Sequence, residues 1–494
     1  MHSTTQQNNR YAWPAAIAAG LLLGGCASLP DRLDLAEDHA ACVKDFQEFD
    51  QRIDDHDVAD GGNARIRDFP WLRANRFLAS WSAELDSESE WEAWLGHLRE
   101  LDLESRRYET ANLTGYAPDD EAVDDILAPL AECGEMLNRQ VMQNPELQDR
   151  LRRQAEVPDD YSRAARFFGI YPITRWFVLF GVHNLHDDQA EALETTHETG
   201  PGQLWRSHVG SYDDPGAAPA PGDLDRDALG IPQPEAADKE ALLDAHAPVW
   251  RVRTATRADR IGRPVWQYPH LPDVDIESPV EFRYISYARF DDEPVLQLNY
   301  MVWFPERPAD NGFLDRLLAG RLDGLIWRIT LDEDGEVLAG ESVHTCGCYY
   351  MAFPGSALQP RDDRPGGEPA FLGPPLPDSA SDEDRIRLTR DSASHYLIGV
   401  DTTDGADSNL RMPVEAADSL RSLPHPRGRK SLYQPDGLVP TTDRPERWLL
   451  WPMGVQSAGA MRQPGRHAIA FAGRRHFDEP RLLFDHFERV EDSD

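Results

Sequence analysis

Two adjoining segments, FRYISYARF (282–290) and PVLQLNYMVWF (294–304), decide the fold class of this chain. Both are rich in aromatic and branched apolar residues, which favour β-strands. Residues 325–331 continue the pattern, and Asp334-Gly335 then supplies the positive φ that a tight hairpin needs before a strand over 337–350. The sequence therefore predicts a large, mostly antiparallel β-rich domain over residues 246–494.

The apolar residues of the N-terminal third follow a helical rather than a strand pattern. Its apolar residues recur at intervals of three and four, as one face of a helix requires. The positions are Leu33, Ala36, Ala40, Val43, Phe46, Phe49 and Ile53, then Trp91, Trp94, Leu95, Leu98 and Leu101, then Ile126, Leu127, Leu130, Met136, Leu137 and Val141. We expect a helical domain over residues 26–200, which makes the whole chain an α+β protein.

Stretches rich in proline and glycine separate these parts. Residues 201–245 are expected to be a linker, and residues 354–384 an insertion within the β-rich domain, because such composition disfavours helices and central strands. The most apolar stretch after the N-terminus, WFVLFGV (176–182), is expected to form a buried strand or helix in a core.

The first 26 residues have the order of a secretory signal. Arg10 precedes an apolar run over residues 13–23, and Leu23-Gly24-Gly25-Cys26 closes it with small residues. The run has 11 residues, against the roughly 20 that a membrane-spanning helix needs. We therefore expect residues 1–25 to be a signal peptide that is removed.

This segment resembles the bacterial lipoprotein signal, whose lipobox ends in the cysteine that receives lipid and becomes the new N-terminus. The resemblance implies acylation of Cys26 and attachment to a membrane through that lipid. In such lipoproteins an aspartate after the cysteine favours the inner membrane. Here Ala27 and Ser28 follow, which implies an outer-membrane lipoprotein facing the periplasm.

The charge balance narrows the kinds of function that this chain can have. The chain has 87 acidic and 50 basic residues, a formal net charge of −37. An acidic surface repels phosphate backbones, so nucleic acid is not expected as a partner. The glycine-rich dinucleotide loop, the P-loop and the His-Glu-x-x-His helix are also missing from the sequence.

Four cysteines remain when Cys26 is set aside, and they allow three pairings. Cys42 and Cys133 both lie in segments with helical periodicity. We favour a disulfide between them, as suits an oxidising compartment.

The best candidate for chemistry is the run His344-Thr345-Cys346-Gly347-Cys348. On a strand, His344, Cys346 and Cys348 would share one face, and imidazole with two thiolates suits zinc or another borderline metal. A straight strand would hold the outer two about 13 Å apart, so a kink at Gly347 is required. A strained, redox-active Cys346–Cys348 disulfide needs the same bend. The third interpretation is two inert thiols beside a core histidine.

A basic cluster near the C-terminus is the second candidate. Arg462, Arg466, Arg474 and Arg475 stand close together in an otherwise acidic chain. Arginines in a pocket would bind carboxylate or phosphate groups bidentately. The alternative is an ion-pair network with neighbouring acidic residues.

Two blocks, residues 320–354 and 433–477, resemble segments of an uncharacterised family of bacterial envelope proteins. The resemblance is carried by residues 322–328, 344–350 and 474–477. That family implies no particular activity. The sequence thus predicts a lipid-anchored envelope protein with a binding or structural role. The alternative is a metal-dependent or thiol-redox enzyme centred on His344, Cys346 and Cys348.

Overall fold

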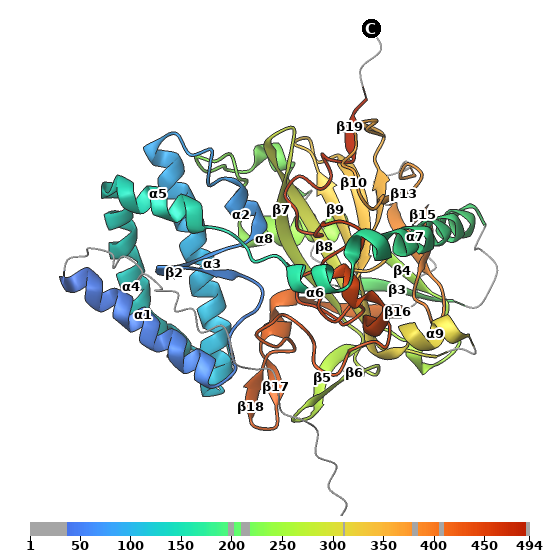
Figure 1. The fold of residues 1–494 in the computed structure, drawn as a ribbon, viewed down its shortest axis with the longest axis horizontal. Coiled ribbons are helices and arrows are strands. Elements are labelled where there is room, and N and C mark those ends of the chain that lie inside the picture. Colours follow the sequence, from blue (N-terminus) through green and yellow to red (C-terminus); the bar gives the residue numbers. More distant parts are fainter. Residues whose placement is uncertain are drawn as a thin grey trace, which may run out of the picture.

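The computed structural model describes residues 37–195, 202–208, 218–309, 312–377, 384–404 and 410–490. It consists of an N-terminal helical part beside a larger β-rich part, so the predicted α+β class is confirmed (Figure 1). The proposed signal peptide and Cys26 lie outside the described residues.

The helical part contains five helices and one short hairpin. They are α1 (Glu37–Asp55), β1 (Ala64–Ile66), β2 (Phe69–Ala74), α2 (Arg76–Ser80), α3 (Glu88–Thr114), α4 (Glu121–Gln143) and α5 (Pro145–Gln154). Ser87 and Glu90 form a capping box at the start of α3, and Gly115 ends that helix with φ +85°. These signals fix the ends of the longest helix, whose buried tryptophans Trp91 and Trp94 then pack into the core.

The disulfide predicted for this part is present. Cys42 of α1 and Cys133 of α4 are joined, with their Cα atoms 5.4 Å apart. The bond links two helices through cysteines that are separated by 91 positions in the chain.

The β-rich part is built on an eleven-stranded sheet with the order β13-β11-β10-β9-β8-β7-β16-β3-β4-β14-β15. The strands are β3 (Gln203–His208), β4 (Val249–Val252), β7 (Glu281–Phe290), β8 (Glu293–Arg307), β9 (Gly320–Leu331), β10 (Val337–His344), β11 (Met351–Pro354), β13 (Phe371–Leu372), β14 (Arg385–Arg390), β15 (Leu397–Thr403) and β16 (Leu410–Ala416).

The expected hairpins are confirmed at the centre of this sheet. Strands β7, β8, β9 and β10 follow one another as antiparallel neighbours. Gly335 lies in the β9–β10 turn with φ +84°, as its Asp-Gly sequence predicted. The parallel pairs of the described sheet lie outside this run of hairpins: β11 with β13, β16 with both β7 and β3, and β14 with β4.

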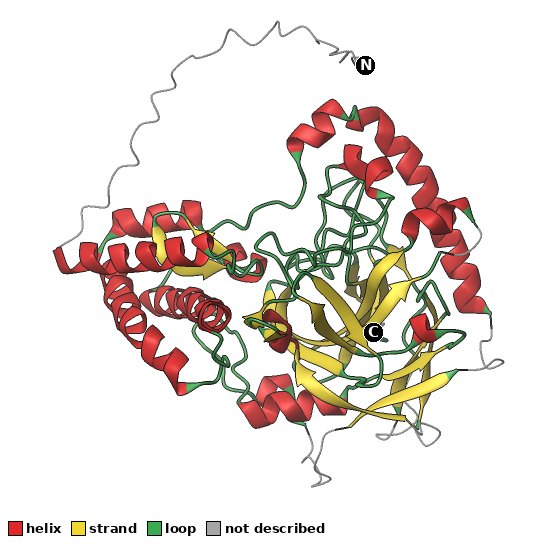
Figure 2. Ribbon diagram, turned by 90° about the horizontal axis from the view of Figure 1, so that it is seen from below, coloured by secondary structure: helices red, strands yellow, loops and turns green. Residues whose placement is uncertain are grey.

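Both faces of the central strands are buried, because the sheet curls around one core and is covered on the other side (Figure 2). Leu298, Tyr300 and Val302 belong to the core inside the curl. Met301 and Trp303 face a second core. That second core is closed by a C-terminal segment with little regular structure, which contains η3 (Ala417–Arg421), β17 (Leu423–His425), β18 (Gly428–Lys430), α10 (Arg447–Leu450), η4 (Trp451–Met453) and β19 (Phe487–Arg489).

The structure differs from the predicted boundaries in three places. α6 (Arg163–Phe168) and α7 (Tyr171–Glu194) lie against the β-rich part, so the helical part ends near residue 155 rather than 200. The expected linker 201–245 contains β3 and α8 (Ala236–Ala245), and the expected insertion 354–384 supplies β12 (Leu358–Pro360) and β13. Short ordered elements fit between prolines there because β3, β12 and β13 are only two to six residues long.

The remaining elements lie outside the main sheet. They are η1 (Pro221–Asp223), η2 (Arg257–Asp259), the hairpin of β5 (Arg263–Tyr268) with β6 (Leu271–Asp275), and α9 (Phe313–Leu318).

Candidate functional site

A cleft of about 430 Å³ lies between the helical part and the main sheet. Its walls come from α2 and α3 on one side and from the C-terminal segment on the other, and β7, β8 and β9 form its floor. A volume of this size is within the range of small-molecule sites, which are often found between two parts of a protein. We refer to this cavity as the inter-part cleft.

The floor of the inter-part cleft is a row of polar side chains on apolar strands. Because side chains alternate along a strand, Tyr284 and Ser286 of β7 share a face with their partners Asn299 and Gln297 of β8. Asn299 Nδ2 donates to Ser286 Oγ at 2.9 Å, and Ser286 Oγ donates to Gln297 Oε1 at 3.1 Å. Gln297 Nε2 in turn donates to Thr330 Oγ1 at 3.2 Å. These amides and hydroxyls can both donate and accept hydrogen bonds.

Three buried polar atoms on residues of this lining have no hydrogen-bond partner in the described structure. They are Asn299 Oδ1, the Tyr433 hydroxyl and Gln463 Oε1. Burial raises the pKa of Tyr433, so its hydroxyl stays protonated and able to donate. A buried polar group without a partner is costly, and a bound ligand or water would satisfy it.

The charged residues around the cleft balance one another. Four basic and four acidic side chains line it: Arg76, Lys239, Arg328 and Arg421, with Glu100, Glu104, Asp418 and Asp478. Their charges sum to zero. Burial would lower the pKa of the lining histidine His97, but Asp227 and Glu100 raise it to about 9, so the histidine is protonated and paired with Asp227. This balance disfavours a strongly charged ligand.

The arginines of this lining are already engaged. Arg328 is bidentate to Glu341 at 2.7 and 2.8 Å, and Arg76 binds Asp478 at 2.9 Å. Arg421 Nη2 lies 3.1 Å from Asp60 Oδ2 and also pairs with Glu104 and Asp418.

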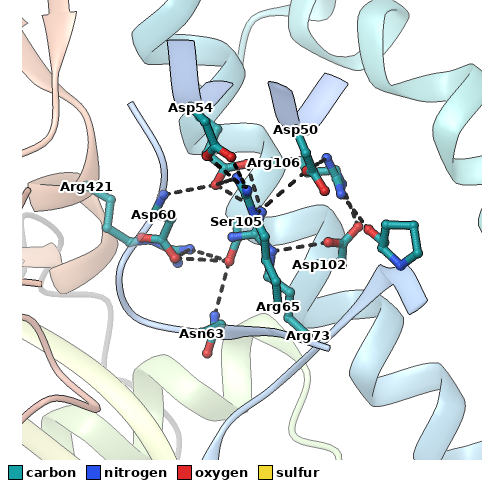
Figure 3. A network of polar contacts seen from close by, with 12 residues as sticks. Asp50, Asp54, Asp60, Asn63, Arg65, Arg73, Asp102, Ser105, Arg106 and Arg421 are labelled. Carbon is teal, nitrogen blue, oxygen red and sulfur yellow. Dashed lines mark hydrogen bonds and ion pairs between the residues drawn. The ribbon is translucent and has the colours of Figure 1, made fainter. Parts of the chain in front are cut away.

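One of these contacts joins the two parts of the molecule. Asp60 belongs to the loop between α1 and β1, whereas Arg421 ends η3 in the C-terminal segment (Figure 3). Behind Asp60, the buried Arg73 binds Asp102 at 3.1 Å and Glu109 at 2.9 Å. This network fixes one wall of the inter-part cleft against the other.

The histidine singled out from the sequence lies elsewhere, on the opposite face of the sheet. His344 ends β10, and its Nδ1 lies 3.3 Å from Oδ1 of the buried Asp323. The other oxygen of Asp323 accepts from Nδ1 of His395 at 2.8 Å, and Nε2 of His395 lies 3.7 Å from Asp259. We call these four residues the His–Asp centre. Phe304 stacks on His395 with ring centroids 4.0 Å apart, which closes the centre on one side.

The electrostatics of this centre keep Asp323 ionised. Burial alone would raise the pKa of Asp323, but the two histidines hold it well below its usual range. Burial lowers the pKa of His344 to about 4, so His344 is neutral near pH 7. Burial would also lower the pKa of His395, yet the carboxylates of Asp259 and Asp323 raise it. The ring atom Nε2 of His344 has no hydrogen-bond partner in the described structure.

Backbone strain is concentrated around the same centre. Leu322, Tyr349, Ala393 and His395 all have φ between +49° and +61°, in the left-handed region that is unfavourable for non-glycine residues. A small cavity of about 10 Å³, the space of one water molecule, is bordered by Asp323, His344, Tyr349 and Glu446 among others. Burial raises the pKa of Glu446 to about 7, against the opposing effect of two arginines.

The strand does bend after His344, at the position where the metal and disulfide interpretations required it. Gly347 has φ +88°, and a Cβ there would lie 2.6 Å from the carbonyl oxygen of Ala468. Cys346 and Cys348 are nevertheless free thiols, and Cys348 N donates to Cys346 Sγ at 3.4 Å. The described residues contain no group of three or more His, Cys, Asp or Glu side chains arranged to hold a metal ion.

The four arginines predicted as an anion site do not converge on a pocket. Arg462 is buried and donates to the carbonyls of Cys346, Gln456 and Ser457. Each of the other three has its own partner: Asp160 at 2.8 Å for Arg466, Asp159 at 2.7 Å for Arg474, and the Glu368 carbonyl at 3.0 Å for Arg475. Arg466 and Arg474 thus form ion pairs, as the alternative interpretation expected, whereas Arg462 and Arg475 bind backbone carbonyls.

Sequence reasoning missed the inter-part cleft. A signal was present, because Ser286, Gln297 and Asn299 are polar residues that share one face of otherwise apolar strands. The residues that complete the lining, such as Tyr433 and Gln463, lie more than a hundred positions away, and only the tertiary fold brings them together.

Comparison with known proteins does not identify the cleft or the His–Asp centre. The chain matches no protein-family model, no curated protein and no solved structure at a significant level.

Proposed function

We propose that this protein is a lipid-anchored component of the bacterial cell envelope that binds a neutral, polyhydroxylated small molecule, such as a saccharide, in the inter-part cleft. The lipobox-like Leu23-Gly24-Gly25-Cys26 supports anchoring at the outer membrane with the body in the periplasm. The observation that carries the binding proposal is a 430 Å³ cleft whose lining charges cancel and whose polar floor is made of amides and hydroxyls.

The ligand class follows from the lining. Hydroxyl groups of a sugar donate and accept hydrogen bonds, as do the side chains of Ser286, Gln297 and Asn299. Aromatic side chains, including Phe77 and Tyr287, which stack at 5.7 Å, offer apolar surface for ring C–H groups. A phosphate or carboxylate would find the arginines already paired with carboxylates.

The test is calorimetric titration with neutral mono- and disaccharides, alongside the corresponding uronic acids and sugar phosphates. Tyr433→Phe removes a hydroxyl that has no partner in the described protein. It should therefore not lower the free energy of unfolding, but it should weaken binding about tenfold, the cost of one lost hydrogen bond.

Tyr300→Phe is the matched control. The Tyr300 hydroxyl donates to the Leu243 carbonyl at 3.0 Å, inside the curl of the sheet. Its loss should cost about 1 kcal/mol of stability without changing affinity. If no neutral saccharide binds, or if the charged compounds bind better, the proposed ligand class is wrong.

A metal-dependent enzyme is the second candidate, favoured by one feature of the His–Asp centre. A carboxylate that fixes Nδ1 of a histidine and leaves Nε2 free is the usual support of a histidine metal ligand, and His344 is held in this way by Asp323. Elemental analysis of the purified protein decides between the candidates. Stoichiometric zinc that is lost in His344→Ala would favour the enzyme, and its absence from the wild type would remove this alternative.

A further inference from the structure

A group of large apolar side chains is exposed on one side of the β-rich part. Ten residues from α6, α7, the junction between them, α10 and η4 form what we call the apolar surface: Phe167, Phe168, Ile170, Ile173, Trp176, Phe177, Phe180, Trp448, Leu449 and Trp451. Their exposed fractions run from 44% for Trp451 to 79% for Phe167. An isolated exposed apolar residue is ordinary, but so many together mark an interaction surface.

The elements that carry these residues contact one another. α6 and α7 both pack against η4. Gly169, between the two helices, lies so close to Pro452 that a Cβ would approach the proline at 2.5 Å. Arg166 Nε also donates to the Met453 carbonyl at 2.7 Å. The ten side chains therefore belong to one structural unit rather than to separate loops.

The outward stripe of α7 has the spacing of a face that is normally buried. Ile173, Trp176, Phe177 and Phe180 stand at positions i, i+3, i+4 and i+7, yet each is more than half exposed. This corrects the expectation that residues 176–182 lie in a core. The helix is held to the body at its other end, where Gln189 is buried and His186 packs edge-on against Phe371.

The charge of this region differs from that of the rest of the chain. Residues 161–186 contain no aspartate or glutamate, although the protein has 87 acidic residues in 494. The segment carries three arginines instead, at 163, 166 and 175. The Arg175 guanidinium lies over the Trp176 ring, 5.2 Å from its centroid. An apolar stripe with tryptophan and flanking arginine is typical of a helix that lies in a membrane interface.

We propose that the apolar surface inserts into the interfacial layer of a lipid bilayer, with the N-terminal half of α7 lying against the headgroups. No helix in the described part of the chain is both long enough and apolar enough to cross a membrane, so the contact is with one leaflet. Acidic surfaces elsewhere on a molecule with net charge −37 are repelled by anionic headgroups, and this acid-free segment is not.

A bilayer fits this surface better than a second copy of the chain. Self-association would bring two strongly acidic molecules together, and their repulsion opposes it. Tryptophans, three of which belong to the apolar surface, place an apolar ring and a polar N–H at the boundary between acyl chains and water. The inference depends neither on the lipid at Cys26 nor on a ligand in the inter-part cleft.

Quenching of tryptophan fluorescence by brominated lipids tests the contact directly. The mature chain from residue 27 onward, which lacks both the expected signal peptide and Cys26, is mixed with vesicles of phosphatidylethanolamine and phosphatidylglycerol brominated near the headgroup end of the acyl chains. We expect quenching that largely disappears in the Trp176→Phe/Trp448→Phe variant, because these two side chains are 62% and 70% exposed. Unchanged quenching would mean that the contact is made elsewhere on the molecule and would overturn the proposal.

Flotation with the same vesicles gives a second readout. Phe177→Glu/Trp448→Glu should reduce the vesicle-bound fraction at least tenfold. Tyr268→Glu, at a 59% exposed aromatic residue of β5 outside the apolar surface, should leave it unchanged. Thermal unfolding should be the same for all variants, since the substituted side chains are exposed. If light scattering instead shows a dimer that Phe177→Glu dissociates, and no quenching occurs, the surface binds a second copy and the membrane proposal is wrong.

Discussion

Asp323 holds His395 at 2.8 Å, although 72 positions separate them in the chain. The contact connects the start of β9 with the turn between β14 and β15, and it requires a left-handed backbone at His395, with φ +55°. Strain of this kind persists only where the surrounding structure compensates for it. The carboxylate between two histidines is such a compensation.

Buried neutral histidines should make the protein sensitive to acid. Burial lowers the pKa of His467 to about 3, with Arg462 adding to the effect, whereas an unfolded histidine titrates near 6.5. The folded state therefore binds its proton less readily than the unfolded state. The resulting stability is fully present above pH 6.5 and is lost as the pH falls toward 3.

Replacing this histidine should reduce the acid sensitivity. Between pH 6 and pH 4, the free energy of unfolding should depend less steeply on pH in His467→Gln than in the wild type. The two slopes should differ by about 1.4 kcal/mol per pH unit. The glutamine amide can still donate to the Thr345 carbonyl, which His467 Nε2 contacts at 3.1 Å. Urea unfolding at several pH values measures the slope. An equal slope in both proteins would contradict the prediction.

The ion pairs of Arg421 should contribute strongly to stability, because they hold the helical part against the C-terminal segment. Its side chain is only 8% exposed and faces the carboxylates of Asp60, Glu104 and Asp418. Arg421→Met would leave these charges uncompensated, so we expect the free energy of unfolding to drop by about 3 to 5 kcal/mol. Arg99→Met removes a pair whose partner Glu135 is 57% exposed and should cost less than about 1 kcal/mol. Similar losses in the two variants would argue against a special role for Arg421.

The disulfide should stabilise the helical part. Cys42 and Cys133 close a loop of 91 residues, and removing such a crosslink costs about 4 kcal/mol by the entropy of the unfolded chain. We expect Cys42→Ser/Cys133→Ser to unfold at a clearly lower temperature than the wild type. Reduction with dithiothreitol should lower the wild-type unfolding temperature and leave that of the double variant unaffected. No response to the reductant in the wild type would mean that the two thiols are not joined.

The other two cysteines should react slowly in the native protein. A thiol attacks as its thiolate, and the hydrogen bond with Cys346 together with burial raises the pKa of Cys348 well above its ordinary value. Cys346 is only 6% exposed. Alkylation by iodoacetamide at pH 7.5 should be about tenfold slower in the native protein than after unfolding. Rapid native alkylation of either residue would restore the thiol-redox interpretation.

Local sequence patterns were enough to predict the fold class, because helical periodicity, runs of strand-favouring residues and an Asp-Gly turn act over a few residues. They could not predict where an apolar face is directed. The stripe from Ile173 to Phe180 has the pattern of a core helix, but α7 meets the body with its other side. The same limit applies to the candidate sites: His344 was found from its sequence neighbours, whereas its partners Asp323 and His395 and the lining residue Tyr433 are brought close only by the tertiary fold.

The lipid anchor is testable without knowing the ligand. If Cys26 is acylated, the mature wild-type chain should begin at that residue and carry the added mass of its acyl chains. Cys26→Ser should remain a precursor that retains residues 1–25 and incorporates no labelled palmitate, because the lipid-accepting thiol is gone.

One acyl chain gives only weak, reversible membrane binding, so a stably anchored protein should carry at least two. Intact-mass spectrometry of protein purified from its envelope fraction measures this, with Cys346→Ser as the processed control. A mature chain that starts elsewhere or lacks acyl mass would show that the resemblance to lipoprotein signals is misleading.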